Sequence, residues 1–169
     1  LGCRIDLGGI GKGWTVDRAV ELLAAFDSFA IDAGGDIFVR GRQADGLPWT
    51  VGVQDPLALE RDLAILSLGD LAVATSSTTR RRWRRDGRQF HHLIDPWTGR
   101  PSEGDVLAAT AVAKSVAWAE VCAKVAVMSP SSAAAAFVER QPAVQVILVL
   151  ADGQVWRRGA SLAEVHDVA

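Results

Sequence analysis

The feature that most constrains the fold of this chain is a series of short apolar segments, each bounded by residues typical of turns. They end at pairs such as Gly34-Gly35, Asp55-Pro56 and Asp152-Gly153. The sequence predicts strands at residues 1–7, 29–32, 36–41, 49–53, 63–68, 71–75, 89–94, 107–113, 144–150 and 154–158. Because these strands follow one another with only a few helices between them, they favour an α+β fold with a mostly antiparallel sheet.

Helical patterns occur at three places. Residues 14–26 carry apolar side chains at a helical spacing, and residues 115–128 are predicted to form a second helix. Ser129 is the expected N-cap of a third helix, with Pro130 at its first position. The sequence shows no internal repeat and no linker, so we expect a single domain over residues 1–169.

The charge balance argues against a general nucleic-acid binder, because the formal net charge is −2. The local exception is the run Arg80–Arg85, in which arginines surround Trp83. Such runs are most often solvated faces. Arginines also bind phosphates, and here a pyrophosphate is as good a candidate as a nucleic-acid backbone.

The two cysteines, Cys3 and Cys122, are too few for a disulfide framework or a multi-cysteine zinc site. We expect both to be small buried apolar residues. No apolar run approaches the roughly 18 residues of a membrane-spanning helix.

A glycine-rich loop, residues 6–13, is predicted between the first strand and the first helix. Glycines let backbone amides approach a ligand closely, and a helix start favours an anion, to which Lys12 would add charge. The spacing matches neither the dinucleotide fingerprint nor the P-loop. A phosphate cradle and a tight strand-to-helix turn are both consistent with it. The hydroxyl-rich segment 75–79 is similarly open between ligand contacts and local hydrogen bonds.

Two of the three histidines of the chain, His91 and His92, stand together just before a turn formed by Pro96, Gly99 and Pro101. Histidine is the side chain whose unperturbed pKa places its charge change near neutral pH. The segment alone is equally consistent with a strand end that caps a turn and with a catalytic site. We expect Asp95 to cap the turn.

Glu120 and Lys124 lie four residues apart on the predicted helix, so they share one face. An exposed ion pair is the simpler interpretation. The rest of the helix is strongly apolar, however, and charged residues are rarely buried unless they are paired or bind a ligand.

Taken in order along the chain, these segments resemble the ApbE family of FAD:protein FMN transferases. The strand-loop-helix motif of the family is similar to residues 6–17, and its Gly-Gly turn is similar to residues 31–37. Its Thr-Ser-Gly segment resembles residues 75–77, and its late helix resembles residues 109–128. The most specific similarity is the signature His-Ile-Ile-Asp-Pro-x-Thr-Gly-x-Pro, which residues 92–101 match almost residue for residue.

This resemblance implies an ApbE-like fold with layers like those of the T-fold, in a fragment of a larger two-lobed protein that lacks the N-terminal portion of the family. Family members bind FAD between two lobes, with a divalent ion, usually Mg²⁺, at the pyrophosphate. They transfer FMN from FAD to a Thr or Ser hydroxyl of an acceptor flavoprotein and release AMP. Some members instead hydrolyse FAD to FMN and AMP.

The resemblance also assigns roles to residues. His92 would be the catalytic residue that accepts the proton of the acceptor hydroxyl, a task suited to an imidazole. The implied FAD contacts are Asp6, Lys12, Thr75 and Leu107. The implied metal positions are the backbone carbonyl near Gly9 and the side chains of Glu120 and Lys124.

Two departures from the family pattern concern the helix. The family usually has Asp and, four residues later, Thr as metal ligands, where this chain has Glu120 and Lys124. An ammonium group cannot ligate Mg²⁺. Our hypothesis is that Lys124 either takes over part of the charge of the cation or pairs with Glu120 and closes the metal site.

Three functions therefore stay open at this point: FMN transfer to a protein, hydrolysis of the FAD pyrophosphate, and flavin binding without catalysis. The expected partners are FAD and an acceptor flavoprotein, and no nucleic acid is expected. Family members are often extracytoplasmic and membrane-anchored. The sequence itself carries no such signal, so it leaves membrane attachment and a cytoplasmic location equally open.

Overall fold

The computed structural model describes residues 5–168. Its elements are α1 (Gly11–Leu22), β1 (Phe29–Asp32), β2 (Asp36–Arg40), β3 (Trp49–Gln54), β4 (Asp62–Leu68), β5 (Leu71–Ser77), β6 (Arg82–Arg85), β7 (Arg88–His91), β8 (Val106–Ala113), α2 (Val116–Met128), α3 (Ser131–Glu139), β9 (Gln145–Leu150), β10 (Val155–Gly159) and β11 (Glu164–Asp167).

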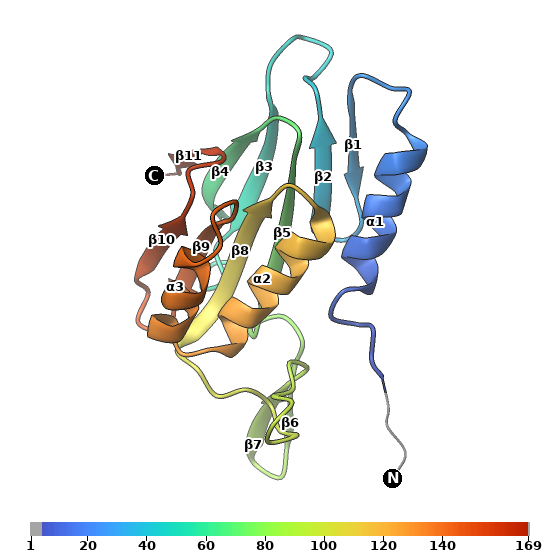
Figure 1. Ribbon diagram of the computed structural model, residues 1–169. Helices are drawn as coiled ribbons and strands as arrows, with labels where there is room; N and C mark the ends of the chain where they lie inside the picture. The colour runs from blue at the N-terminus through green and yellow to red at the C-terminus, as the bar shows by residue number, and fades with distance from the viewer. Residues whose placement is uncertain (1–4, 169) are drawn as a thin grey trace.

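The centre of the molecule is a six-stranded sheet with the order β1-β2-β5-β8-β9-β10. A second sheet has the order β11-β4-β3, and β6 and β7 form a separate hairpin. All neighbouring strands pair antiparallel, as the sequence predicts. The helices lie on one face of the large sheet, and the hairpin projects from the end at which the chain enters α1 (Figure 1). The α+β class is therefore confirmed.

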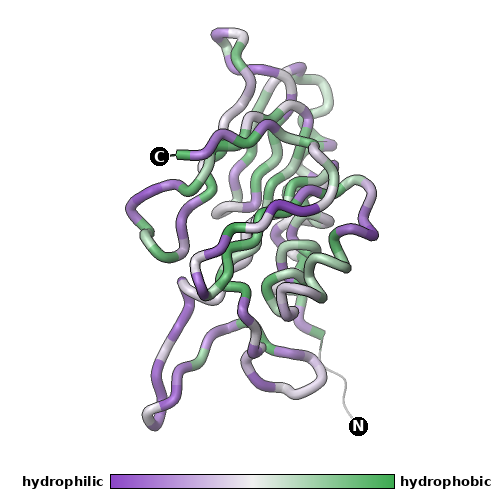
Figure 2. Tube along the Cα trace, turned by 90° about the vertical axis from the view of Figure 1, so that its left-hand side faces the viewer, coloured by the Kyte–Doolittle hydropathy of each residue, from purple (hydrophilic) through white to green (hydrophobic). Residues whose placement is uncertain are grey.

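The large sheet is buried on both faces, which explains why its central strands are almost continuously apolar. Alternate residues of β5 face opposite sides: Ala72 and Ala74 pack toward the helices, whereas Leu71 and Val73 pack toward the smaller sheet. Hydrophobic residues accordingly concentrate in the body of the molecule, and the hairpin is mostly hydrophilic (Figure 2). Two cores, one on each side of the sheet, hold the layers together.

Small side chains allow α2 to lie close to the sheet. Its face toward β5 and β8 consists largely of alanines, and those strands present alanines in return. Ala119, Ala123 and Ala126 are fully buried. Close packing of this kind leaves no room for a longer side chain at the contact. The position of the Glu120 and Lys124 side chains is thus fixed by a helix that has little freedom to shift.

The first helix is tied to α2 by side chains that complete the helix ends. Asp17 on α1 accepts hydrogen bonds from the backbone N–H groups of Val116 (2.8 Å) and Ala117 (3.0 Å), which have no partner within their own helix. A carboxylate at a helix N-terminus is favourable because it meets free N–H groups and the positive end of the helix dipole. Sequence reasoning did not single out Asp17.

Gly13 is the point of closest approach between the two helices, and this gives a prediction about stability. A Cβ atom at Gly13 would lie 2.7 Å from Ala117 Cα and 2.8 Å from Ala117 N, both backbone atoms. We therefore expect Gly13→Ala to lower the free energy of unfolding by about 1–3 kcal/mol, measured by urea denaturation. Gly11→Ala in the same helix is the matched control, because a Cβ there meets only Leu7 Cβ, at 3.8 Å. Equal stability of the two variants would contradict this account of the helix contact.

Most predicted elements are confirmed within one or two residues, but the strand predicted at residues 89–94 ends at His91. The first helix begins at Gly11 rather than at residue 14 and ends at Leu22 rather than at residue 26. Pro130, not Ser129, is the N-cap of α3. The predicted strand at residues 1–7 lies partly outside the described residues, and residues 5–7 do not form a strand. The strands β6 and β11 were not predicted at all.

The prediction for Cys122 is confirmed, because this residue is a free, fully buried thiol. Burial raises its pKa to about 11, so it stays protonated and unreactive at neutral pH. Cys3 lies outside the described residues. Within residues 5–168, none of the helices combines the length and apolar character needed to cross a bilayer.

Candidate active site

The glycine-rich loop turns tightly into α1. Gly8 N–H donates to Asp6 Oδ1 at 2.7 Å, and the N–H groups of Ile10 and Gly11 both donate to the carbonyl of Leu7. Asp6 therefore holds the backbone of the loop in place. The N-cap residue of α1, Ile10, makes no side-chain hydrogen bond to the helix, and the first turn of α1 contains no acidic residue. The start of α1 keeps the positive character that favours an anion.

Glu120 of α2 caps the start of α1, because its carboxylate accepts a hydrogen bond from a free backbone N–H group there. Its Oε2 accepts a hydrogen bond from Gly13 N–H at 3.0 Å, although the two residues are 107 positions apart. The other carboxylate oxygen, Oε1, lies 3.5 Å from Lys124 Nζ. The Glu120 side chain is only 4% exposed, so both its oxygens are committed inside the protein. The shared helix face predicted for Glu120 and Lys124 is confirmed, and it points at the glycine loop.

Lys124 connects this carboxylate to the loop itself. Its ammonium group donates to the carbonyl oxygen of Gly8 at 3.2 Å. A Cβ atom at Gly9 would lie 3.5 Å from Lys124 Cδ, so the lysine side chain packs over the loop. The Lys124 side chain is 23% exposed, in contrast to the Glu120 side chain. The ammonium group of Lys124 is thus held by the Gly8 carbonyl and Glu120, and part of the side chain stays accessible to solvent.

A second ion pair stands beside the first. Lys12 Nζ lies 2.7 Å from Asp36 Oδ2, and the Asp36 side chain is only 2% exposed. The Lys12 ammonium group supplies the positive charge that this buried carboxylate oxygen requires. Burial raises the pKa of Asp36, and the charge of Glu120 adds to this effect, while Lys12 and Lys124 oppose it. Together Lys12, Asp36, Glu120 and Lys124 form what we call the charge cluster.

Asp36 is the member of the charge cluster that sequence reasoning missed. It opens β2, and its register partner on β5 is Ala74, whose side chain faces the helices. Asp36 therefore faces α1 and α2 as well. The available signal was a carboxylate directly in front of the buried residues of β2. A carboxylate in such a position needs a partner.

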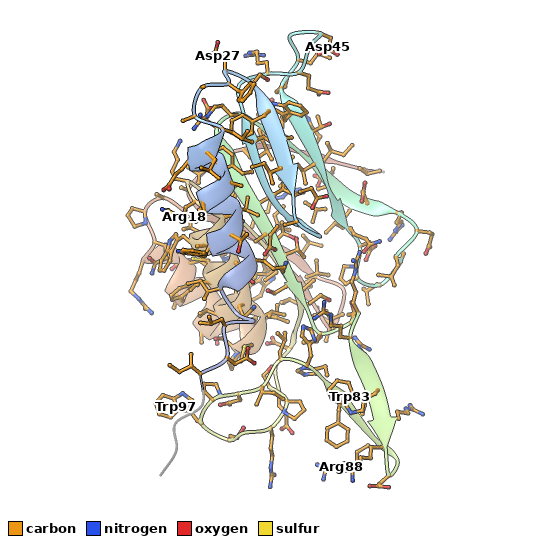
Figure 3. All side chains as sticks on the ribbon, turned by 90° about the vertical axis from the view of Figure 1, so that its right-hand side faces the viewer. Arg18, Asp27, Asp45, Trp83, Arg88 and Trp97 are labelled. Atoms are coloured by element: carbon orange, nitrogen blue, oxygen red, sulfur yellow. The ribbon has the colours of Figure 1, made fainter. Side chains whose placement is uncertain are left out.

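His92 lies on the loop that follows β7 and is exposed. Its pKa is lowered below 6.5, chiefly by partial desolvation and further by the positive charges of Arg81, His91 and Lys124. Lys124 is therefore close enough to act on the charge of His92. This places the histidine signature at the end of the molecule that holds the charge cluster. Trp97 of the same loop lies there too, where the chain enters α1 (Figure 3).

The residues around His92 have structural roles. Leu93 N–H donates to His91 Nδ1 at 3.3 Å, which leaves the proton on Nε2, and Nε2 then donates to the carbonyl of Ser102 at 2.9 Å. Asp95 Oδ1 accepts from Trp97 N–H at 2.7 Å and from Thr98 N–H, so its predicted role as a turn cap is confirmed. His91 and Asp95 thus brace the loop that carries His92.

Thr75 and Leu107 lie on the two central strands, apart from the charge cluster. Thr75 follows Ala74 on β5 and so points to the opposite face of the sheet from Asp36. Its hydroxyl is 2.9 Å from that of Thr110. Leu107 offers its backbone carbonyl to Thr78 N–H, at 2.9 Å. The predicted FAD contacts of these two residues stay predictions, and that of Thr75 concerns the opposite face of the sheet from Asp36.

The donor set at the loop does not fit a divalent cation. Glu120 already accepts a hydrogen bond from Gly13 N–H. The carbonyl of Gly8, next to the Gly9 position expected to ligate a metal, already accepts one from the ammonium group of Lys124. Lys124 itself has no lone pair to offer a metal. Among the described residues, no three His, Cys, Asp or Glu side chains come together in a metal-binding arrangement.

The model of the ApbE family matches residues 1–148, which is most of the chain. The chain belongs to the ApbE family. The FAD:protein FMN transferase of Treponema pallidum (strain Nichols) is 33% identical over 165 residues, which cover 91% of this chain and 46% of that protein. The protein of the same name from Vibrio cholerae is 35% identical over 119 residues, covering 69% of this chain and 36% of its own length.

Solved structures of the family agree with the fold. The ApbE protein of Thermotoga maritima superposes with a TM-score of 0.81 at 30% identity, covering 92% of this chain and 51% of that one. The flavin transferase ApbE of Vibrio cholerae gives 0.78 at 30% identity, covering 93% and 50%. This chain thus spans about half the length of the ApbE proteins it matches.

Proposed function

We propose that this chain carries the catalytic part of an FAD:protein FMN transferase, which moves FMN from FAD to a Thr or Ser hydroxyl of an acceptor flavoprotein. One observation carries the proposal: His92, the glycine loop and α2 are far apart in sequence, yet Lys124 reaches the loop and acts on the charge of His92. A base and fixed positive charges at one place are what attack on a pyrophosphate requires. The names of the ApbE relatives support the same activity.

The proposed reaction is a displacement at phosphorus. The acceptor hydroxyl oxygen bonds to the phosphorus on the riboflavin side of FAD while the bond to the bridging oxygen breaks. AMP leaves with that oxygen, and His92 takes the hydroxyl proton. The pKa of His92 lies below 6.5, so the imidazole is neutral and ready to accept a proton at pH 7.

The two lysines of the charge cluster have a different task in this proposal. Their ammonium groups attract the phosphoryl oxygens, on which negative charge increases in the transition state. Asp36 holds Lys12 at 2.7 Å, and Glu120 holds Lys124 at 3.5 Å, so neither lysine has to be ordered when FAD arrives. Such preorganisation avoids an entropic cost at the moment of reaction.

The proposed function is tested by incubating the full-length protein with FAD and an acceptor domain that has a flavinylation Thr, then separating the products. AMP together with covalently bound FMN supports transfer. Free FMN and AMP formed without an acceptor would indicate a pyrophosphatase instead. Unchanged FAD would contradict both enzymatic functions and favour a flavin-binding domain.

The lowered pKa of His92 leads to a prediction about pH. As the pH falls through this pKa the imidazole gains a proton and ceases to be a base, so activity should decline only below pH 6.5. Removing a neighbouring positive charge makes protonation easier. The Lys124→Met substitution should therefore raise the pKa of His92, which NMR titration of the imidazole C–H signals would measure directly.

The matched control for this titration is Lys114→Met, because Lys114 is exposed in the turn before α2. It should leave the His92 titration unchanged. If Lys124→Met also left it unchanged, the two side chains would be too far apart to share a site.

A further inference from the structure

The charge cluster combines two carboxylates with two ammonium groups, and its formal charges cancel. We propose that the ammonium group of Lys124 is a built-in cation, which binds the pyrophosphate of FAD at the glycine loop without a divalent metal ion. This inference rests on the proposed function, because it takes FAD as the ligand. It concerns how the ligand is held and adds a residue, Lys124, to the phosphate-binding groups.

The contacts of Lys124 leave it one hydrogen bond to offer. An ammonium group has three donors. The Gly8 carbonyl at 3.2 Å takes one, and Glu120 Oε1 at 3.5 Å takes a second. The side chain is still 23% exposed, so the third donor is accessible to a ligand. A charge-assisted hydrogen bond to a phosphate oxygen is the strongest use of such a donor.

The same contacts exclude a metal ion from this place. A divalent cation that used the Gly8 carbonyl and Glu120 as ligands would have to lie where the ammonium group now is. Charges of like sign at a few ångströms repel strongly in a partly buried site. Glu120 is also held by Gly13 N–H at 3.0 Å and cannot turn away to form a separate site without leaving that donor unpaired.

Burial of the carboxylates explains why the lysines stay in position. The Asp36 and Glu120 side chains are 2% and 4% exposed, so each needs a nearby cation to offset the loss of solvation. Lys12 and Lys124 provide these charges, and both keep an exposed portion. The cluster therefore presents two ammonium groups on a rigid acidic base, an arrangement suited to the two phosphates of a pyrophosphate.

The first experiment measures FAD binding to the full-length protein by flavin fluorescence, in EDTA and in millimolar MgCl₂. We expect the dissociation constants in the two solutions to agree within about twofold. Lys124→Met should weaken binding at least about tenfold in EDTA, because a charged hydrogen bond is lost. Lys114→Met, the matched control, should bind like the unchanged protein. The double variant Glu120→Gln/Lys124→Met repeats the test without an unpaired carboxylate, in case the single variant folds poorly.

A second experiment uses Mn²⁺ as a probe of the closed site, followed by electron paramagnetic resonance without FAD. The unchanged protein should bind no Mn²⁺ at the loop. Lys124→Thr removes the ammonium and frees Glu120 and the Gly8 carbonyl, oxygen ligands that suit Mn²⁺, so it should gain Mn²⁺ binding that Glu120→Gln abolishes. Failure of Lys124→Thr to gain binding would overturn the inference.

The outcomes separate this inference from the proposed function. FAD binding that requires Mg²⁺ would overturn the built-in cation and leave the transferase proposal intact. Absence of FAD binding in both solutions would overturn both. FAD binding in EDTA that depends on Lys124 and not on Lys114 supports the inference.

Discussion

A His92→Ala variant should lose FMN transfer by a factor of about 10²–10⁴, the usual contribution of a positioned general base. The neighbouring His91 and Asp95 cannot replace it, because both are committed to hydrogen bonds within the loop that carries His92. His91 is engaged at both ring nitrogens, and Asp95 caps the turn. The rate is measured as AMP released per enzyme at saturating FAD and acceptor. Binding of FAD should change little, because His92 acts on the acceptor hydroxyl.

The third histidine supplies the control for this prediction. His166 lies on β11, where its Nε2 is 3.1 Å from Ser67 Oγ, in the smaller sheet. His166→Ala should leave the rate within about twofold of the unchanged protein, since its loss removes a surface contact alone. Equal rates for the two variants would mean that His92 is not the base.

The largest expected effect on stability comes from Glu120→Ala, which should lower the free energy of unfolding by about 3 kcal/mol. The substitution removes the acceptor of the buried Gly13 N–H and the partner of Lys124 at once. Groups left unpaired in this way lose solvation without compensation. Urea denaturation would show a lower midpoint with an unchanged m-value.

Two further variants make the stability test specific. Glu139→Ala replaces an exposed glutamate at the end of α3 and should change stability by no more than about 0.5 kcal/mol. Glu120→Gln keeps an acceptor for Gly13 N–H and loses only the charge, so it should fall between the other two. If Glu120→Ala were as stable as Glu139→Ala, the hydrogen bond from Gly13 N–H to Glu120 would not stabilise the fold.

The sequence predicts the large sheet well because each of its strands has an apolar pattern and a turn signal of its own. The strand β6 is followed by the turn signal Asp86-Gly87 but has no apolar pattern, since it is the arginine run at residues 82–85. It forms because Asp86 and Gly87, both at positive φ, make a tight hairpin turn, and because Trp83 stacks on Phe90 across it. All four residues of β6 are exposed, as the interpretation of the run as a solvated face predicts.

Where the local sequence pattern predicts an element wrongly, tertiary contacts determine where that element begins and ends. Glycines disfavour a helix, so the sequence predicts that the first helix begins after Gly13. The structure begins it at Gly11, because Glu120 accepts Gly13 N–H and because only glycine fits against Ala117. The short strand β11 depends likewise on pairing with β4, from Ser67 to Ala64. Neither partner is visible from local sequence.

The candidate site, like the fold, could be predicted from the sequence only in part. The family resemblance and the spacing of Glu120 and Lys124 bring the loop, the helix and His92 together, and the structure confirms the helix face and the turn cap. The role of Asp36 could not be predicted, because it follows from the register between β2 and β5. The opposite orientation of Thr75 follows from that register as well.

The most direct test of the central claim, that His92 acts as the base in FMN transfer to a protein, is the intact mass of an acceptor domain after incubation with FAD and the full-length protein. With the unchanged protein, the acceptor should gain the mass of one FMN less one water. It should gain nothing over the same time with His92→Ala and the same mass with His166→Ala. An acceptor that stays unmodified by the unchanged protein, or is modified equally by His92→Ala, would contradict the account.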